Sequence, residues 1–346
     1  MTDMEKVLSI IIPTYNMEDY LRRCLDSLII KDEKTFVKLE VLVINDGSRD
    51  SSSLIAHEYE ERFPEVFRVI DKDNGNYGSC INCGIDEAKG EYFKILDADD
   101  WYDTEALKKL IVTISKHKDV DAFFTCFTYH NFNQNIITSY KYKTINYDVK
   151  YSINDVAFVN SADEFMLKMY SLTVKLRILR DINLRLDTGI SFTDTELLYF
   201  PYDSIKNVYF LDADVYQYFI GREGQTISPE NGLKSISHVY LIANRFFDDF
   251  VLNKSKFLSK NIFNVKLFFV TEYCLAYFNQ IIGAENHALY KNELLGLYKK
   301  VKNDKDVLRR IRRKSPFFVL WEYTGLYKGD KWAKPLRSIL NVYKKK

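Results

Sequence analysis

The sequence lacks an apolar run that could cross a membrane. Its longest stretch without a charged residue, residues 122–140, contains Asn131, Asn133, Gln134 and Asn135. A bilayer core accepts such amide side chains only at a high cost, so we predict no transmembrane helix. The N-terminus, Met-Thr-Asp-Met-Glu-Lys, also lacks the basic and then apolar pattern of a secretory leader.

Cysteine is scarce and has no disulfide pattern. The five cysteines, at 24, 80, 83, 126 and 274, are odd in number and irregularly spaced. Neither a second Cys pair nor a nearby His completes Cys80-x-x-Cys83 as a zinc or redox site. We interpret the protein as reduced and cytoplasmic.

Two common phosphate-binding motifs are missing as well. The sequence has neither Gly-x-x-x-x-Gly-Lys-Ser/Thr nor a Gly-x-Gly-x-x-Gly that opens a helix. These absences exclude a P-loop and a dinucleotide fingerprint. A phosphate site without them usually depends on a metal ion or on Arg and Lys side chains.

The sequence does contain a regular alternation of strands and helices. Short apolar runs predict strands at 7–13, 39–44, 66–70 and 92–96, and helices are expected after Asn16, at 51–63 and at 82–88. This order predicts an α/β, Rossmann-like and mainly parallel sheet. Helical periodicity follows at 233–251, 263–282 and 289–301, so we expect a domain at 1–228 and a helical region at 229–346.

Each predicted strand ends in a polar cluster. The four clusters are Pro13-Thr14-Tyr15-Asn16, Asn45-Asp46-Gly47-Ser48, Asp73-Asn74-Gly75-Asn76 and Asp97-Ala98-Asp99-Asp100. Ligands of such sheets bind at the carboxyl ends of the strands, so we expect one site there. Asp46 is suited to accept hydrogen bonds from a nucleobase or ribose, and Tyr15 to support the base.

The acidic cluster at 97–100 has two interpretations. Carboxylates this close repel one another unless a cation or a hydrogen-bond donor compensates, and Mg²⁺ or Mn²⁺ bound to one or two of them plus phosphates would do so. The alternative is a solvated acidic turn that caps a helix starting near Thr104, with Asp100 as a candidate cap. The cluster alone leaves both open, and the other strand ends favour the metal.

Three of these segments resemble one known family. Ser9-Ile-Ile-Ile-Pro-Thr-Tyr-Asn16, Val43-Ile-Asn-Asp-Gly-Ser48 and Gly90-Glu-Tyr-Phe-Lys-Ile-Leu-Asp-Ala-Asp-Asp-Trp101 resemble family 2 glycosyltransferases of the GT-A fold. The resemblance covers about the first two thirds of the chain. It implies a GT-A nucleotide-diphospho-sugar transferase fold, a nucleotide-sugar donor and a bound Mn²⁺ or Mg²⁺.

The resemblance also implies residue roles. Asp46 is expected to read the nucleobase, Asp97 to contact the nucleotide and Asp99 to bind the metal. The other expected donor contacts are Pro13, Tyr15, Asn74, Asn76 and Ala98. Many relatives carry an Arg where this chain has Ile81, so one cationic contact to the donor is missing. Arg222 resembles the basic residue of a lid over the diphosphate and is expected to replace that contact.

The expected catalytic base is Asp194. It lies in Phe192-Thr193-Asp194-Thr195-Glu196, which matches the family's Glu-Asp pair after a Phe, with Thr193 in place of the commoner Glu. That departure leaves open whether Glu196 shares the role. The alternative is that Asp194 only caps the helix that follows.

The C-terminal tail is strongly basic. Residues 299–346 hold 16 Lys/Arg and 4 Asp/Glu, a charge of +12 in a chain of net +1. Beside its aromatic residues this charge favours an anionic membrane surface, which would place the protein on the inner face of the cell membrane. A solvated basic helix is the alternative. No nucleic-acid reader motif accompanies the charge, so no nucleic acid is expected.

Together these features predict an inverting glycosyltransferase (a hexosyl- or N-acetylhexosaminyl-transferase) acting from a UDP-sugar on a hydroxyl of a glycan, lipid-linked or protein-linked acceptor. The resemblance implies a role in cell-surface polysaccharide or glycoconjugate synthesis. Two alternatives remain: a metal-dependent nucleotidyltransferase, which also groups carboxylates around metal, and a catalytically silent glycan-binding relative.

Overall fold

The computed structural model describes residues 5–159, 161–222, 235–282 and 287–324. The chain divides into two compact units, Met1–Gln225 and Thr226–Lys346. The domain boundary predicted after residue 228 falls in residues 223–234, outside the described residues.

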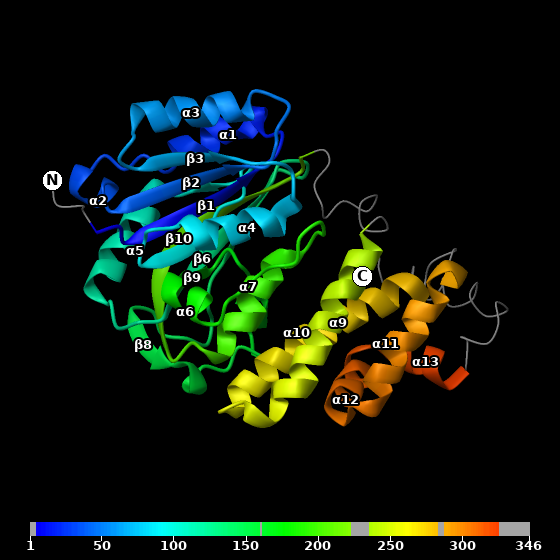
Figure 1. Cartoon of the computed structure of the whole chain (residues 1–346). Helices are drawn as coiled ribbons and strands as arrows, with labels where there is room; N and C mark the ends of the chain where they lie inside the picture. The colour runs from blue at the N-terminus through cyan, green and yellow to red at the C-terminus, as the bar shows by residue number, and fades with distance from the viewer. Residues whose placement is uncertain (1–4, 160, 223–234, 283–286, 325–346) are drawn as a thin grey trace. The chain divides into compact units, whose positions relative to one another are not determined.

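The described part of the first unit forms a ten-stranded sheet in the order β3-β2-β1-β4-β9-β6-β10-β5, with β7 beside β6 and β8 beside β10 (Figure 1). The strands are β1 Leu8–Thr14, β2 Leu39–Asn45, β3 Phe67–Asp71, β4 Tyr92–Ile95, β5 Trp101–Tyr102, β6 Ala122–Asn131, β7 Ile136–Tyr140, β8 Val149–Ser152, β9 Leu172–Lys175 and β10 Asn207–Ile220. The α-helices are α1 Glu18–Asp26, α2 Glu33–Phe36, α3 Ser52–Arg62, α4 Asn76–Glu87, α5 Thr104–Lys116, α6 Leu176–Asp181 and α7 Glu196–Tyr199. The 3-10 turns are η1 Ile153–Asp155, η2 Glu164–Met166, η3 Thr193–Thr195 and η4 Phe200–Asp203.

The first half of this sheet is parallel, which confirms the predicted α/β class. β1 pairs with β2 and β4, and β2 pairs with β3, all in parallel. Every residue of β2 is buried, as expected for a strand covered on both faces. Helices α3 and α4 contact these strands and complete the crossovers (Figure 1).

The second half mixes strand directions. β9 runs antiparallel to both of its neighbours, β4 and β6, whereas β6 and β10 are parallel to each other. The short strand β5 lies antiparallel on β10 directly after the acidic cluster. The pairing of β10 with β6 shifts register between Leu211 and Tyr216, which bends β10 beside the cluster.

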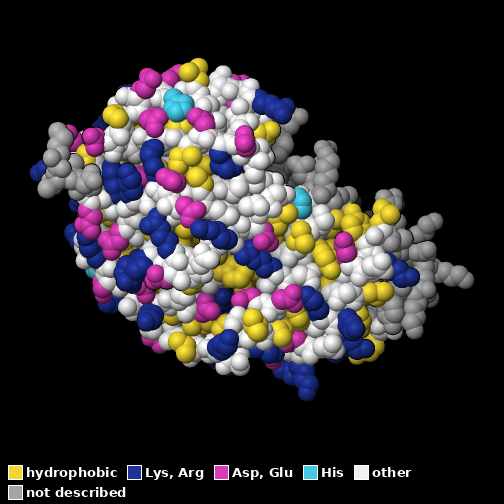
Figure 2. All heavy atoms as spheres, viewed as in Figure 1, with side chains coloured by type: hydrophobic (Ala, Val, Ile, Leu, Met, Phe, Trp, Pro, Cys, Tyr) yellow, Lys and Arg dark blue, Asp and Glu magenta, His cyan; other side chains and the backbone are white. Residues whose placement is uncertain are grey.

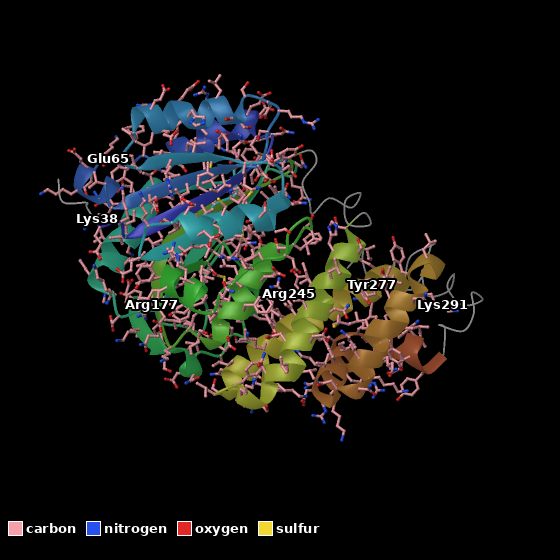
Figure 3. The ribbon with its side chains drawn as sticks, viewed as in Figure 1. Lys38, Glu65, Arg177, Arg245, Tyr277 and Lys291 are labelled. Atoms are coloured by element: carbon pink, nitrogen blue, oxygen red, sulfur yellow. The ribbon has the colours of Figure 1, made fainter. Side chains whose placement is uncertain are left out.

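The amino ends of the strands lie at one edge of the sheet. Lys38 and Glu65, which precede β2 and β3, lie close together there (Figure 3). The Lys6 ammonium ties this edge by donating to the carbonyl oxygens of Val37 and Leu39 at 2.9 and 2.8 Å, and to that of Glu65. The carboxyl ends of the parallel strands therefore meet at the opposite edge.

Two helix starts differ from the prediction. Asn16 is not the cap of α1: Met17 occupies that position, and Asn16 adopts a left-handed φ of 53°. Its side-chain oxygen accepts the Arg49 N–H at 2.8 Å, so Asn16 joins two loops. Helix α4 begins at Asn76, six residues before the predicted Asn82, because a Gly-Asn-Tyr-Gly sequence conceals its first turn.

The second unit is helical, as predicted. It contains α9 Ile236–Asn253, α10 Lys260–Ile282, α11 Lys291–Asn303, α12 Lys305–Lys314 and α13 Pro316–Thr324, with 3-10 turns η5 Lys254–Lys256 and η6 His287–Tyr290. Tyr277 of α10 and Lys291, the first residue of α11, are labelled in Figure 3. The Tyr277 hydroxyl donates to the Glu293 carboxylate at 3.1 Å, which joins α10 to α11.

Two aromatic residues of the basic tail belong to the core of this unit. Phe318 and Trp321 are 0% and 2% exposed, and their rings lie 5.0 and 6.1 Å from Phe278. They are therefore not available to a membrane. Among the described helices, none is long and apolar enough to span a bilayer.

Candidate active site

The acidic cluster follows β4 and is largely buried. Asp99 and Ala98 are 9% and 2% exposed, and Asp100 is fully buried. Burial, followed by the charge of Asp99, raises the pKa of Asp97 to about 7. A group of carboxylates held this way needs a positive partner when it ionises.

Asp100 is a structural anchor. Its two carboxylate oxygens accept the Tyr216 hydroxyl and the Phe219 N–H, each at 2.7 Å, and so fix the cluster to β10. The idea that Asp100 caps the next helix is wrong, because Asp103 is the cap of α5 and accepts the Ala106 N–H at 2.8 Å. Each carboxylate oxygen of Asp100 therefore already has a hydrogen-bond donor from β10.

Asp99 pairs with the expected lid residue. Its carboxylate accepts the Arg222 Nε–H at 2.8 Å, and both side chains are mostly buried. Its backbone carbonyl accepts the Arg23 guanidinium at 2.7 Å, and that guanidinium lies 4.2 Å from the Trp101 ring centre. Two arginines thus offset the acidic charge at the position predicted for the metal.

Asp46 lies buried at the end of β2 and receives several donors. Its carboxylate accepts the N–H groups of Gly75 and Asn76, each at 2.9 Å, and the Lys72 ammonium at 2.5 Å. The Asn74 amide donates to the Asp46 carbonyl at 2.9 Å. The loops after β2 and β3 therefore meet at Asp46, as the strand-end argument predicted.

The loop after β1 reaches the same edge. The Met17 and Glu18 N–H groups donate to Ser52 and Asp50, at 2.7 and 3.0 Å. Pro13 is half-buried at the end of β1, and Tyr15 is 43% exposed on the rim. The Tyr15 ring is thus accessible to a planar ligand.

Tyr77 joins the two predicted halves of the site. Its neighbour Asn76 donates a backbone N–H to Asp46, and the Tyr77 hydroxyl donates to Asp97 at 2.9 Å. Asn76 has a left-handed φ of 69°, a conformation that asparagine tolerates better than most residues. One dipeptide at the start of α4 thus connects the candidate base-reading residue to the acidic cluster.

Asp194 lies within electrostatic range of Asp97 and of the Tyr77 hydroxyl. Burial is the largest cause of the raised pKa values of Asp97 and Tyr77, and the negative charge of Asp194 adds to both. Burial raises the pKa of Asp194 itself, and the Lys168 charge partly opposes this. Asp194 is not a helix cap, because Phe192 precedes η3 and Thr195 precedes α7 at the cap positions.

Glu196 has a different environment. It is fully buried and accepts the Asp187 N–H at 2.8 Å. It therefore holds the loop that precedes Asp194. This position favours Asp194 over Glu196 as the group that meets an acceptor.

The segment that carries Asp194 is strained and closely packed. Phe192 has a φ of 68°, which is unusual for a bulky residue and is typical of functional sites. The Asn82 side-chain oxygen accepts the Leu186 N–H at 2.8 Å, and its side-chain NH₂ donates to the Leu186 carbonyl at 2.9 Å. Asn82, in the segment with the expected donor contacts, thus supports the loop that carries the candidate base.

Gly78 lets this loop approach α4. A Cβ at Gly78 would lie 2.0 Å from the Asp187 carbonyl oxygen, a backbone atom. We expect Gly78→Ala to displace residues 187–193 and to lower transfer activity about 10²-fold, because a misplacement of about 1 Å can have that effect. Steady-state kinetics would measure it, with Gly296→Ala as the control because the nearest atom to its Cβ, the Tyr240 hydroxyl, lies 3.8 Å away. An unchanged kcat in Gly78→Ala would contradict the packing argument.

The carboxylates of the cluster suit a metal ion that is bound partly by the protein and partly by substrate phosphates. No group of three or more His, Cys, Asp or Glu among the described residues forms a self-sufficient metal site. Mg²⁺ and Mn²⁺ commonly take one or two carboxylates plus substrate phosphates. Asp99, which has one oxygen on Arg222, fits that pattern.

Comparison with known proteins gives a consistent result. Residues 9–173 match the sequence model of the family described as Glycosyl transferase family 2. Among curated relatives, a glycosyltransferase MG025 homolog of Mycoplasma pneumoniae is 35% identical over 120 residues, 34% of this chain and 40% of that protein. Glycosyltransferase GlyA of Streptococcus pneumoniae is 32% identical over 127 residues, 37% of this chain and 17% of that protein. The matches thus span less than half the length of these relatives.

Solved structures show the same fold. Staphylococcus aureus TarS 1–349 in complex with UDP-GlcNAc has a TM-score of 0.62 at 18% identity, covering 96% of this chain and 88% of that one. The mannosyltransferase PcManGT of Pyrobaculum calidifontis, in complex with GDP-Man and Mn²⁺, has a TM-score of 0.50 at 14% identity, covering 99% and 89%. The predicted GT-A fold is therefore confirmed.

Proposed function

We propose that this chain, whose residues 9–173 match the model of glycosyl transferase family 2, transfers a sugar from a nucleoside-diphosphate donor, a UDP-sugar, to an acceptor hydroxyl. The observation that carries the proposal is the link through Asn76 and Tyr77. It connects Asp46 to Asp97, which lies two residues before Asp99 and within electrostatic range of Asp194. This arrangement supports a base reader, a diphosphate site and a proton acceptor in one active site.

The donor contacts follow from this geometry. Tyr15 and the Asp46 group bind the nucleobase, with Pro13, Asn74 and Asn76 shaping its surroundings. Asp97 and the backbone at Ala98 face the nucleotide, and Asp99 would hold Mn²⁺ or Mg²⁺. When bound, the ion neutralises the negative charge of the diphosphate leaving group.

Asp194 accepts the proton in the proposed step. The acceptor oxygen forms a bond to the anomeric carbon while the bond from that carbon to the diphosphate oxygen breaks. The acceptor's proton passes to the Asp194 carboxylate, and attack opposite the leaving group inverts the anomeric centre. A carboxylate with a raised pKa is a stronger base, and burial provides this at Asp194.

Nucleotide binding tests the proposal most directly. We expect UDP with Mn²⁺ to raise the melting temperature, because a ligand that binds only the folded state stabilises it. CDP and GDP with Mn²⁺ are the controls for the base. Stabilisation by UTP, together with release of pyrophosphate from UTP when a sugar 1-phosphate is added, would instead support a nucleotidyltransferase. Glycan binding without any nucleotide effect would support a silent relative.

Arg222 is expected to compete with the metal and to assist the donor. Because it occupies one Asp99 oxygen, Arg222→Ala should bind Mn²⁺ roughly tenfold more tightly in the absence of nucleotide. The same variant should bind UDP about tenfold more weakly, since a charge-assisted phosphate contact is lost. Electron paramagnetic resonance of free Mn²⁺ and calorimetry of UDP would measure the two effects. Arg177→Ala, an equal charge change on α6, is the control (Figure 3).

The proposed membrane contact rests on exposed basic residues of α12. Arg309 and Arg313 are exposed, whereas Arg312 and Lys314 form ion pairs with Glu322 and Glu272. On the face in Figure 2, by contrast, the Lys/Arg and Asp/Glu side chains of the first unit are interspersed. An anionic inner membrane surface, where the acceptor would be assembled into cell-surface glycan, is therefore the proposed location.

Vesicle binding tests this contact. We expect Arg309→Ser with Arg313→Ser to lower partitioning to phosphatidylglycerol vesicles about 30-fold, at about 1 kcal/mol per cation. Lys291→Ser with Lys299→Ser removes the same charge from exposed positions of α11 and is the control. Equal losses in the two double variants would mean that total charge, rather than α12, attracts the membrane.

A further inference from the structure

A group of aromatic rings lies next to the candidate active site. We define the tyrosine face as Tyr129 of β6, Tyr140 of β7, Tyr218 of β10, and Phe165 and Tyr170 from the segment between β8 and β9. Neighbouring ring centres lie 4.7 to 5.0 Å apart for Tyr140–Phe165, Tyr129–Tyr140, Tyr170–Tyr218 and Tyr129–Tyr218. The rings therefore form one continuous surface.

Strand register explains why these rings share a side of the sheet. Tyr218 pairs with Tyr129, and the buried Phe127 of β6 pairs with Tyr140. Residues two apart on a strand project to the same face, so Phe127 and Tyr129 point together. His130, the next residue, projects to the other face, where its ring lies 4.7 Å from Trp101.

The tyrosine face is continuous with the candidate catalytic groups. The Tyr170 ring lies 4.7 Å from Tyr216, whose hydroxyl donates to Asp100. The Tyr170 hydroxyl is within electrostatic range of both Asp97 and Asp194. At the outer end, the Lys168 ammonium lies 5.2 Å from the Phe165 ring centre and within range of Asp194.

A buried lysine fixes the inner edge of this surface. The Lys94 ammonium of β4 donates to the carbonyl oxygens of Tyr170 and Leu172, at 2.8 and 3.1 Å. Lys94 is 1% exposed, so these contacts are shielded from water. The backbone of Tyr170 is therefore tied to β4 of the sheet.

The chemistry of the face suits one kind of occupant. Its four tyrosines are half-buried and Phe165 is 44% exposed, so ring surfaces remain accessible. Phenol rings present an apolar body with a polar tip, whereas an acyl chain would need no such tips. A pyranose ring has a matching apolar C–H face and a rim of hydroxyls.

We propose that the tyrosine face binds the acceptor sugar and stacks against its apolar face, so that a hydroxyl of that sugar points toward Asp194. The inference rests on the proposed transferase function and specifies its acceptor as a carbohydrate ring. It assigns Phe165 and Tyr140 as specificity-determining residues for that ring.

Saturation-transfer NMR of the full chain with methyl glycosides of hexoses and N-acetylhexosamines tests the proposal. We expect at least one glycoside to bind, and Phe165→Ala to weaken it about 3- to 10-fold, the value of one aromatic contact. Tyr140→Leu should weaken it similarly, and Tyr140→Phe, which keeps the ring, much less. Ile137→Ala removes an exposed side chain from the opposite face of β7 and is the control.

Three outcomes would overturn the proposal. They are no saturable binding of any glycoside, equal binding by all variants, and a Phe165-dependent binding of octanoate in place of the glycosides, which would identify a lipid site. UDP and Mn²⁺ melting shifts, measured on the same samples, separate this inference from the proposed function. Normal UDP shifts with no glycoside effect reject only the tyrosine face. Glycoside binding without UDP shifts rejects the transferase, and with it the role of the bound sugar as acceptor.

Discussion

Asp99→Asn is expected to lower kcat/KM for transfer about 10³-fold, because it removes the carboxylate that would hold the metal against the diphosphate. The change is isosteric, and the amide oxygen of Asn can still accept the Arg222 Nε–H that Asp99 accepts at 2.8 Å. The fold should therefore persist. The dependence of the remaining activity on Mn²⁺ concentration should shift to much higher values.

A matched control separates charge from metal binding. Asp103→Asn removes one negative charge four residues away, at the cap of α5. Asn is as good a cap as Asp, so this variant should keep both stability and activity. Normal Mn²⁺-dependent transfer by Asp99→Asn would reject Asp99 as the metal residue.

The parallel half of the sheet and its strand-end clusters were predictable from the sequence. The runs that became β1, β2 and β4 are mostly apolar, with Glu40 and Lys94 as their charged residues, and each is followed by a conspicuous polar motif. The carboxyl ends of parallel strands must meet at one edge, so Asp46 and Asp99 could be placed near each other without coordinates. The structure links the two loops through Asn76, which donates to Asp46, and Tyr77, which donates to Asp97.

The connections between these groups were not predictable. Tyr77 follows two residues that resemble a loop, and a tyrosine there gives no sign that its hydroxyl reaches Asp97. Lys94 is a charged residue in an apolar strand, where its position suggests a solvent-facing side chain, yet it is buried on two backbone carbonyls. Both contacts join segments that are distant in the sequence: Tyr77 and Asp97 are 20 residues apart, and Lys94 and Tyr170 are 76 residues apart.

The antiparallel strand β9 was also missed. Its sequence, Leu-Thr-Val-Lys, is only four residues long and has no turn motif that specifies a partner. Its direction is fixed by pairing with β4 and β6 on either side. The tyrosine face depends on this placement, since the segment that leads into β9 carries Phe165 and Tyr170.

Asp194→Asn is expected to lower transfer about 10²- to 10⁴-fold, the usual contribution of a positioned base, while UDP and Mn²⁺ bind normally. Steady-state kinetics with calorimetry of UDP would separate the two effects. Asp181→Asn, an exposed carboxylate on α6, is the matched control. If transfer were retained in Asp194→Asn and lost in Glu196→Gln, the base would be Glu196.

Asp194→Asn should also affect stability: it lowers transfer but should not lower the melting temperature at high pH. Burial raises the pKa of Asp194 above its unfolded value, so its contribution to the free energy of unfolding is full at pH below the unfolded pKa and declines as pH rises through the folded pKa. Asparagine stays neutral and escapes that decline. At pH 8 the variant should therefore melt at or above the wild-type temperature although its transfer is lost, and at pH 4 the difference should shrink. If Asp194→Asn lost activity and also melted at a lower temperature than the wild type at pH 8, the assignment of Asp194 as the base would be contradicted, because that pattern indicates a structural role.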